Sequence, residues 1–178
     1  MEPLAQLNDL MPTLGALVET VTHADLDRAT PCTDFTVRGV LEHMVGGASA
    51  FAAGYRGDEA HDFDTTDVVA AWSQAMTELG EAVNAADALG RQIEAPFGTV
   101  PGDTFARFIA LDGLVHGWDI SRAIGANYQP SDDLVAAADE FARAAIEPLR
   151  GDAFDPAVEA PTGADAMTRL AAFTGRQI

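Results

Sequence analysis

A hydrophobic period of about 3.6 residues recurs along almost the whole chain, and no other feature limits its fold as strongly. Ala-rich segments with this period alternate with short clusters of Pro, Gly and Asp, and no stretch shows the apolar–polar alternation of a half-buried strand. Four of these segments are long and of similar length. The sequence therefore predicts an all-α fold, an antiparallel four-helix bundle with an extra C-terminal helix and short extended excursions.

The four long predicted helices have recognisable end signals. Thr36 can cap the second helix, either Thr65 or Thr66 can cap the third, and Gly125 stops the fourth. Each helix carries an apolar stripe suited to a common core. The predicted spans are residues 7–21, 36–55, 65–86 and 105–123.

Shorter elements are predicted between and after these helices. Residues 91–103 contain too much Pro and Gly for a helix, and we expect a hairpin-like excursion there. Ser131 is expected to cap a fifth helix. The remaining predicted spans are 131–150 for this fifth helix, 154–160 for a short extended piece and 163–176 for a last helix.

The charge balance disfavours two classes of partner. Ten Lys and Arg residues stand against 28 Asp and Glu residues, and the resulting formal net charge of −18 repels both nucleic-acid phosphates and anionic lipid. We therefore expect no nucleic-acid partner and no membrane partner. Because the chain has 178 residues and no long linker, we expect residues 1–178 to form one domain.

The sequence also indicates a cellular compartment. The single Cys32 rules out an internal disulfide and suits a reducing environment. The first residues show no basic leader before an apolar run, and no stretch of about 18 apolar residues predicts a spanning helix. We therefore expect a cytoplasmic protein.

Polar side chains interrupt the apolar stripe of the segment Phe105–Ala123. The helical period places Asp112, His116 and Asp119 on the same face as apolar residues. Burying such groups without partners costs roughly 2 kcal/mol or more each, and far more for an ionised carboxylate. A divalent metal ion is the simplest compensation. His43, at the edge of the second helix's apolar stripe, offers a further ligand.

The spacing of these residues suits an open metal site. Asp112 and His116 lie four residues apart, so a helix brings them close enough to share an ion. Two imidazoles and a carboxylate suit zinc and also ferrous iron, and three protein ligands leave coordination positions free. Asp119 either takes the carboxylate position itself or hydrogen-bonds a ligand or a metal-bound water and so orients it. Without a metal, Asp112 would instead hydrogen-bond His116 or cap a neighbouring helix.

Other candidate residues carry weaker signals. Cys32 could act as a nucleophile only with a lowered pKa, which nothing nearby in the sequence clearly supplies, so we expect it either to pack or to be exposed without a role. Arg122 follows Asp119 by about one turn and is expected to pair with a carboxylate. His23 and His61 lie in polar loops and are not expected to be functional. The chain has no Gly-rich phosphate loop, GxSxG elbow or CxxC pair, so nucleotide chemistry and covalent serine hydrolysis lack support.

Three motifs carry a resemblance to a known family. The segments TPCTDFTVRGVLEHMVGG, LDGLVHGWDISRAIG and RLAAFTGRQ resemble the DinB-like superfamily, in particular the metal-binding N-terminal domain of mycothiol-dependent maleylpyruvate isomerases. The resemblance implies a four-helix bundle that holds one divalent ion through His43, Asp112 and His116. This chain has Asp112 where the isomerase has Glu, so its carboxylate reaches one methylene less far.

The resemblance also implies a kind of chemistry. In such relatives a divalent ion activates the sulfur of a low-molecular-weight thiol such as mycothiol. For this chain we expect the ion to be zinc, or else nickel or iron. We therefore expect a metal-dependent S-transferase or isomerase that takes a small-molecule substrate and a thiol. The maleylpyruvate isomerases have a further C-terminal domain that this chain lacks room for, so their particular reaction, the isomerisation of maleylpyruvate, is not expected here. The alternatives are a non-catalytic metal-binding or stress-response protein and a thiol-independent metal hydrolase. Pairing of DinB-like bundles implies a homodimer.

Overall fold

The protein is mostly helical, with one small sheet. The computed structural model describes residues 1–95 and 98–178. Within these residues the helices are α1 (Pro3–Val18), α2 (Val37–Arg56), α3 (Val68–Val83), α4 (Gly102–Ile124), α5 (Asp132–Ala145) and α6 (Ala166–Phe173), and the strands are β1 (Gln92–Ala95) and β2 (Gly98–Pro101). The helical content agrees with the predicted class. No helix in the described part of the chain is long and apolar enough to cross a membrane.

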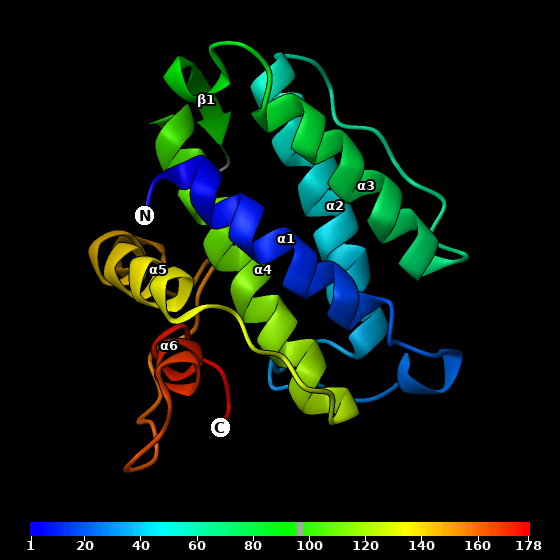
Figure 1. The fold of residues 1–178 in the computed structure, drawn as a ribbon, viewed down its shortest axis with the longest axis vertical. Coiled ribbons are helices and arrows are strands. Elements are labelled where there is room, and N and C mark those ends of the chain that lie inside the picture. Colours follow the sequence, from blue (N-terminus) through cyan, green and yellow to red (C-terminus); the bar gives the residue numbers. More distant parts are fainter. Residues whose placement is uncertain (96–97) are drawn as a thin grey trace.

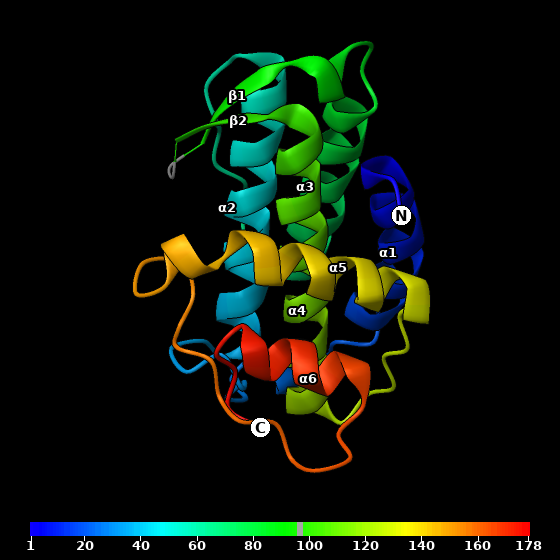
Figure 2. The same cartoon turned by 90° about the vertical axis from the view of Figure 1, so that its left-hand side faces the viewer.

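Helix α4 lies at the centre of the molecule. Helix α1 packs along α4, and α2 packs against both α3 and α4 (Figure 1). Figure 2 shows α5 and α6 lying across α4, steeply inclined to the long helices. Helix α4 therefore has neighbours on several sides.

This central position changes how α4 is buried. Every residue from Ile109 to Ser121 except Asp112 is buried, so the predicted single apolar stripe was only part of the buried surface. Two glycines allow the neighbours to approach closely. A Cβ on Gly113 would lie 3.0 Å from Leu10 of α1, and one on Gly117 would lie 2.5 Å from the Tyr128 hydroxyl. Larger side chains at these positions would push the neighbours away from α4.

The predicted end signals of three helices are confirmed. The Thr36 side chain accepts a hydrogen bond from the backbone N–H of Gly39 at the start of α2. Ser131 accepts one from Leu134 at the start of α5. Gly125 follows α4 with φ of 71°, the left-handed conformation that glycine adopts without steric cost. These local signals therefore set the ends of the helices that form the site.

Other boundaries differ from the prediction. Helix α3 begins at Val68 and ends at Val83 rather than near Ala86. Its cap is Asp67, not Thr65 or Thr66, because the Asp67 carboxylate accepts from the N–H of Ala70. The first and last helices, α1 and α6, are displaced or shortened relative to residues 7–21 and 163–176.

The hairpin-like excursion is confirmed, and its strands pair antiparallel with Ile93 opposite Val100. Residues 96 and 97, which the predicted excursion also includes, lie outside the described part of the chain. The predicted extended piece 154–160 does not form a strand of several residues. Phe154 alone pairs with Arg150, in a single parallel β-bridge. The prediction of an extended element there was therefore only partly right.

The C-terminal segment is attached to the helices through Arg150 and Phe173. The Arg150 guanidinium donates to the carbonyl oxygen of Phe173 at 3.1 Å and lies 4.8 Å from the centre of its ring. Arg143 of α5 lies 4.5 Å from the same ring. These contacts hold residues 149–155 and the end of the chain against the face of α4 and α2, where they form part of a cavity wall.

Candidate metal centre

His43 and His116 face each other across the contact between α2 and α4. Their ring centroids are 4.8 Å apart, and the rings are inclined at 66°. His43 lies two turns into α2, and its ring also contacts Phe35, 5.5 Å away, in the turn before that helix. The His116 side chain is buried, whereas 42% of the His43 side chain is exposed. One imidazole therefore belongs to the core and the other faces an opening.

Asp112 completes a triangle of ligand atoms. Its Oδ1 lies 3.6 Å from Nε2 of His43 and 3.5 Å from Nε2 of His116. The three side chains offer ligand atoms that all lie within 4.8 Å of one another. Two ligand atoms bound at about 2.0–2.1 Å to a tetrahedral zinc ion lie about 3.4 Å apart. The arrangement therefore suits a small divalent ion with only minor adjustment.

Asp119 contacts the opposite side of the His116 ring. Its Oδ2 lies 3.0 Å from Nδ1 of His116, and the carboxylate is fully buried. An ionised carboxylate can only accept, so Nδ1 carries the proton and the lone pair of Nε2 points toward Asp112 and His43. Because the two ring nitrogens lie on different sides, this arrangement favours Asp112 as a ligand and Asp119 as the group that orients His116.

Arg176 balances the charge of Asp119. Its Nε donates to the Asp119 carboxylate at 3.2 Å, and only 9% of Arg176 is exposed. The Arg122 guanidinium does not contact Asp119; it lies over the ring of Trp118, 5.7 Å from its centre. A backbone hydrogen bond and, to a smaller extent, the charge of Arg122 lower the pKa of another carboxyl, that of Asp165. Local spacing suggested Arg122. The partner of Asp119 is Arg176, which lies 57 residues later in the chain. The sequence signal for it was the motif RLAAFTGRQ, which contains Arg176.

The electrostatics of the triangle favour an ionised acid. Partial removal from solvent raises the pKa of the half-buried Asp112, but the adjacent imidazoles of His116 and His43, together with the charge of Arg176, lower it by more, and the net shift is downward. The hydrogen bond to Asp112 raises the pKa of His43, although burial opposes this shift. A metal ion would therefore compete with a proton for His43.

A cavity of about 420 Å³ opens beside the three candidate ligands. Its walls include Arg176, the turn 32–35 and the loop 149–155. Cys32 is half-buried there, and burial raises the pKa of its thiol. The expectation that Cys32 is not a nucleophile agrees with this shift. Sequence periodicity did not indicate the contribution of the 149–155 loop, because this loop meets the site only through tertiary packing.

The two loop histidines lie in other surroundings. His61 lies 3.6 Å from Glu78 of α3, and 53% of its side chain is exposed. His23 begins a short 3₁₀ turn after α1. Neither belongs to the group of His43, Asp112 and His116.

Comparison with known proteins gives a family match. Residues 7–121 match the family described as mycothiol maleylpyruvate isomerase N-terminal domain, a span that includes all four candidate site residues on α2 and α4 but not Arg176. Two relatives, named as uncharacterized proteins of Mycobacterium tuberculosis strains CDC 1551 / Oshkosh and ATCC 25618 / H37Rv, are each 28% identical over 181 residues and cover 100% of both chains. No solved structure matches the chain.

Proposed function

The chain belongs to the family of mycothiol maleylpyruvate isomerase N-terminal domains, and we propose that it is a metal-dependent enzyme that acts with a low-molecular-weight thiol. Its chemistry would be a mycothiol-type S-transfer or isomerisation. We propose further that residues 1–178 form a single domain, in which α1–α4 are a DinB-like antiparallel four-helix bundle.

The convergence of His43, Asp112 and His116 is the observation that carries this proposal. Two imidazole nitrogens and one carboxylate oxygen lie within 4.8 Å of one another beside a cavity. Zinc matches the donor set best, and nickel and iron accept the same ligands. A bound divalent ion would lower the pKa of a thiol and hold it as a thiolate nucleophile.

The protein's own residues would prepare this centre. Asp119 keeps the proton of His116 on Nδ1, so Nε2 is free to bind. Arg176 balances the buried charge of Asp119. The 420 Å³ cavity has room for a polar thiol and a small-molecule substrate next to the ion. Because the thiol must stay reduced, we place the protein in the cytoplasm. We also propose that two copies of the chain form a homodimer.

Zinc titration of the metal-free protein by calorimetry tests the proposal. We expect one ion per chain and a loss of at least 100-fold in affinity for His116→Ala, since one of three ligands is removed. The matched control is His61→Ala, which removes an imidazole outside the centre and should leave affinity unchanged. Wild-type affinity in His116→Ala would refute the assignment.

Cobalt substitution then distinguishes the chemical alternatives. Added thiols should change the visible spectrum of the cobalt protein, because sulfur binds directly to the ion. Hydrolysis of small esters without any thiol would support the hydrolase alternative instead. A large loss of thermal stability on chelation, with no thiol binding and no activity, would indicate a non-catalytic metal-binding protein.

A further inference from the structure

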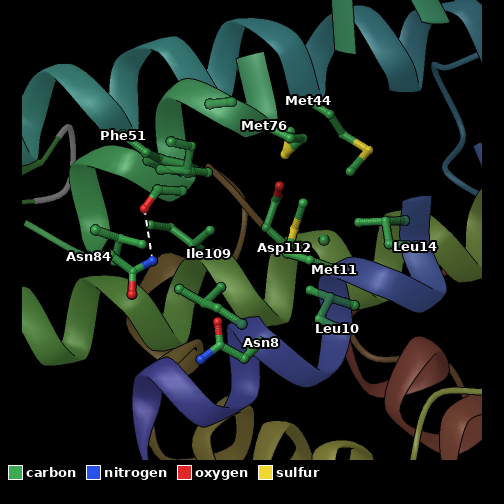
Figure 3. A pocket seen from close by; sticks show the side chains of 16 residues that line it. Asn8, Leu10, Met11, Leu14, Met44, Phe51, Met76, Asn84, Ile109 and Asp112 are labelled. Carbon is green, nitrogen blue, oxygen red and sulfur yellow. Dashed lines mark hydrogen bonds between the residues drawn. The ribbon is translucent and has the colours of Figure 1, made fainter. Parts of the chain in front are cut away.

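A second, apolar cavity lies between α1, α2, α3 and α4. We propose that it binds a compact hydrophobic group of the compound that reacts at the metal centre. This inference rests on the proposed function and names its substrate class. The cavity has a volume of about 70 Å³ and is lined by residues of α1, α2, α3 and α4. Met11, Met44 and Met76 line it from three different helices (Figure 3).

Two residues connect this cavity to the metal centre. Asp112 and Phe51 line both the apolar cavity and the 420 Å³ cavity. Figure 3 shows the Asp112 side chain rising from α4 into the space that also receives Met11, Met44 and Met76. The carboxylate that would bind the ion therefore stands at the boundary between a polar compartment and an apolar one.

The chemistry of the inner wall selects for a hydrophobic occupant. Among its described lining residues, Asp112 is the charged one, and most of the others are aliphatic, aromatic or Met side chains. The side-chain amide of Asn84, the residue after α3, donates to the carbonyl oxygen of Gly80 at 2.8 Å, so it is already engaged (Figure 3). Asn8 and Asn84 are exposed, so the cavity opens to solvent beside them, whereas the rest of its wall offers water few hydrogen-bond partners. Burying an alkyl or aryl group against this wall removes apolar surface from water, so such a group is a better occupant than water.

The size of the cavity limits the group that it accepts. An engineered cavity of about 150 Å³ in another protein binds benzene, and the present volume is roughly half of that. Three flexible Met side chains allow it to expand around a ligand. The substrate class is therefore a compound with an electrophilic or metal-binding head and a short alkyl chain or single ring. The polar thiol would occupy the larger cavity.

NMR of methyl-labelled methionine tests whether the cavity binds such a group, with benzene as the probe. The chain has five Met residues, of which Met11, Met44 and Met76 line the cavity. Met1 and Met167 do not line it and serve as internal references. We expect benzene to shift the three cavity signals and leave both references unchanged. The absence of such shifts, or equal shifts in all five signals, would overturn the proposal.

Gly80 offers a direct way to fill the cavity. It lines the cavity, and a Cβ built on it meets no heavy atom within 4 Å. We expect Gly80→Leu to abolish the benzene shifts, and Gly80→Ala, which adds one methyl group, to reduce them if the larger variant does not fold. The matched control is Gly46→Leu on α2, where a Cβ also meets nothing but the residue is exposed. Shifts that persist in a folded Gly80→Leu would overturn the proposal.

Two thiols test the connection to the metal centre in the cobalt protein. Here the alkanethiol stands in for the substrate rather than for the polar thiol: its sulfur is the metal-binding head and its alkyl chain is the hydrophobic group. If the chain enters the apolar cavity, 1-butanethiol should bind about tenfold more tightly than ethanethiol, because each buried CH₂ contributes about 0.8 kcal/mol. This preference should disappear in Gly80→Leu and remain in Gly46→Leu. Equal affinities in the wild type would overturn the connection. A failure to bind cobalt would refute the proposed function, whereas the benzene result would still decide whether the cavity binds a hydrophobic group.

Discussion

Asp119→Asn isolates the part that a buried charge plays at this centre. The substitution keeps the size of the side chain but removes its negative charge, which lies 3.0 Å from Nδ1 of His116. Hydrogen bonding to a carboxylate makes an imidazole a stronger ligand, and loss of such a partner costs about 10–100-fold in metal affinity. That range corresponds to about 1.4–2.8 kcal/mol. We therefore expect zinc affinity to fall by this factor without loss of the three direct ligands.

The same substitution leaves Arg176 as a buried cation without its anion. Breaking one side of a buried ion pair destabilises a protein by about 3–5 kcal/mol, so the metal-free Asp119→Asn protein should unfold at a clearly lower urea concentration. Replacing Arg176 by Met in the same chain removes the unpaired cation. We expect this double variant to recover part of the stability but none of the zinc affinity.

Calorimetric zinc titration and urea denaturation of the single and double variants measure the two effects separately. Asp139→Asn is the matched control, because Asp139 pairs with Arg143 at 2.8 Å on the surface of α5. Exposed pairs contribute at most about 1 kcal/mol, so both zinc affinity and stability should change little. A folded Asp119→Asn protein with wild-type zinc affinity would refute the role assigned to Asp119.

Three further changes test other parts of the structure. The hydrogen bond to Asp112 raises the pKa of His43, so protons should compete with zinc for this side chain. We expect zinc affinity to fall as the pH decreases, with a midpoint above 6.5, the ordinary pKa of histidine. A midpoint below 6.5 would contradict this prediction. Cys32→Ser should keep zinc affinity and thiol-dependent activity, and loss of activity with zinc still bound would make Cys32 a reacting group. Gly117→Ala should lower the free energy of unfolding by about 1–3 kcal/mol, because the added methyl group clashes with Tyr128. Gly46→Ala, where a Cβ meets nothing, should raise it by up to about 1 kcal/mol. Equal effects of the two substitutions in urea denaturation would exclude the clash.

Local sequence signals predicted the elements that carry the site. Thr36 and Gly125 bound α2 and α4 as expected, because caps act within one turn. The same locality explains the error at α3. Several capping side chains lie together before this helix, and composition alone does not decide between Thr65, Thr66 and Asp67.

The candidate ligands were predictable only in part. Asp112 and His116 share a helix, so their spacing alone brings them together. Asp119 lies seven residues after Asp112 on the same stripe, and periodicity could not decide which carboxylate faces His43. That choice depends on how the His116 ring turns between them. Arg176 contacts the site from the far end of the chain, which no local pattern encodes.

The pairing of Asp119 with Arg176 also determines the charge of the proposed centre. A divalent ion bound by two neutral imidazoles and Asp112 keeps one positive charge in excess. If Asp119 were also a ligand, the centre would be neutral and would attract a thiolate less strongly. Because Arg176 balances Asp119 instead, the excess charge remains available to an incoming anion.

The walls of the larger cavity restrict which anion can use this charge. Beyond the candidate ligand Asp112, three more acidic side chains line the cavity: Asp34, Asp152 and Asp155. A compound with several carboxylates would be repelled by these groups before it reached the ion. A neutral thiol that loses its proton only on binding would not be repelled. Under the proposed function, we therefore expect a reactant whose negative charge appears at a single atom, the one that would contact the ion.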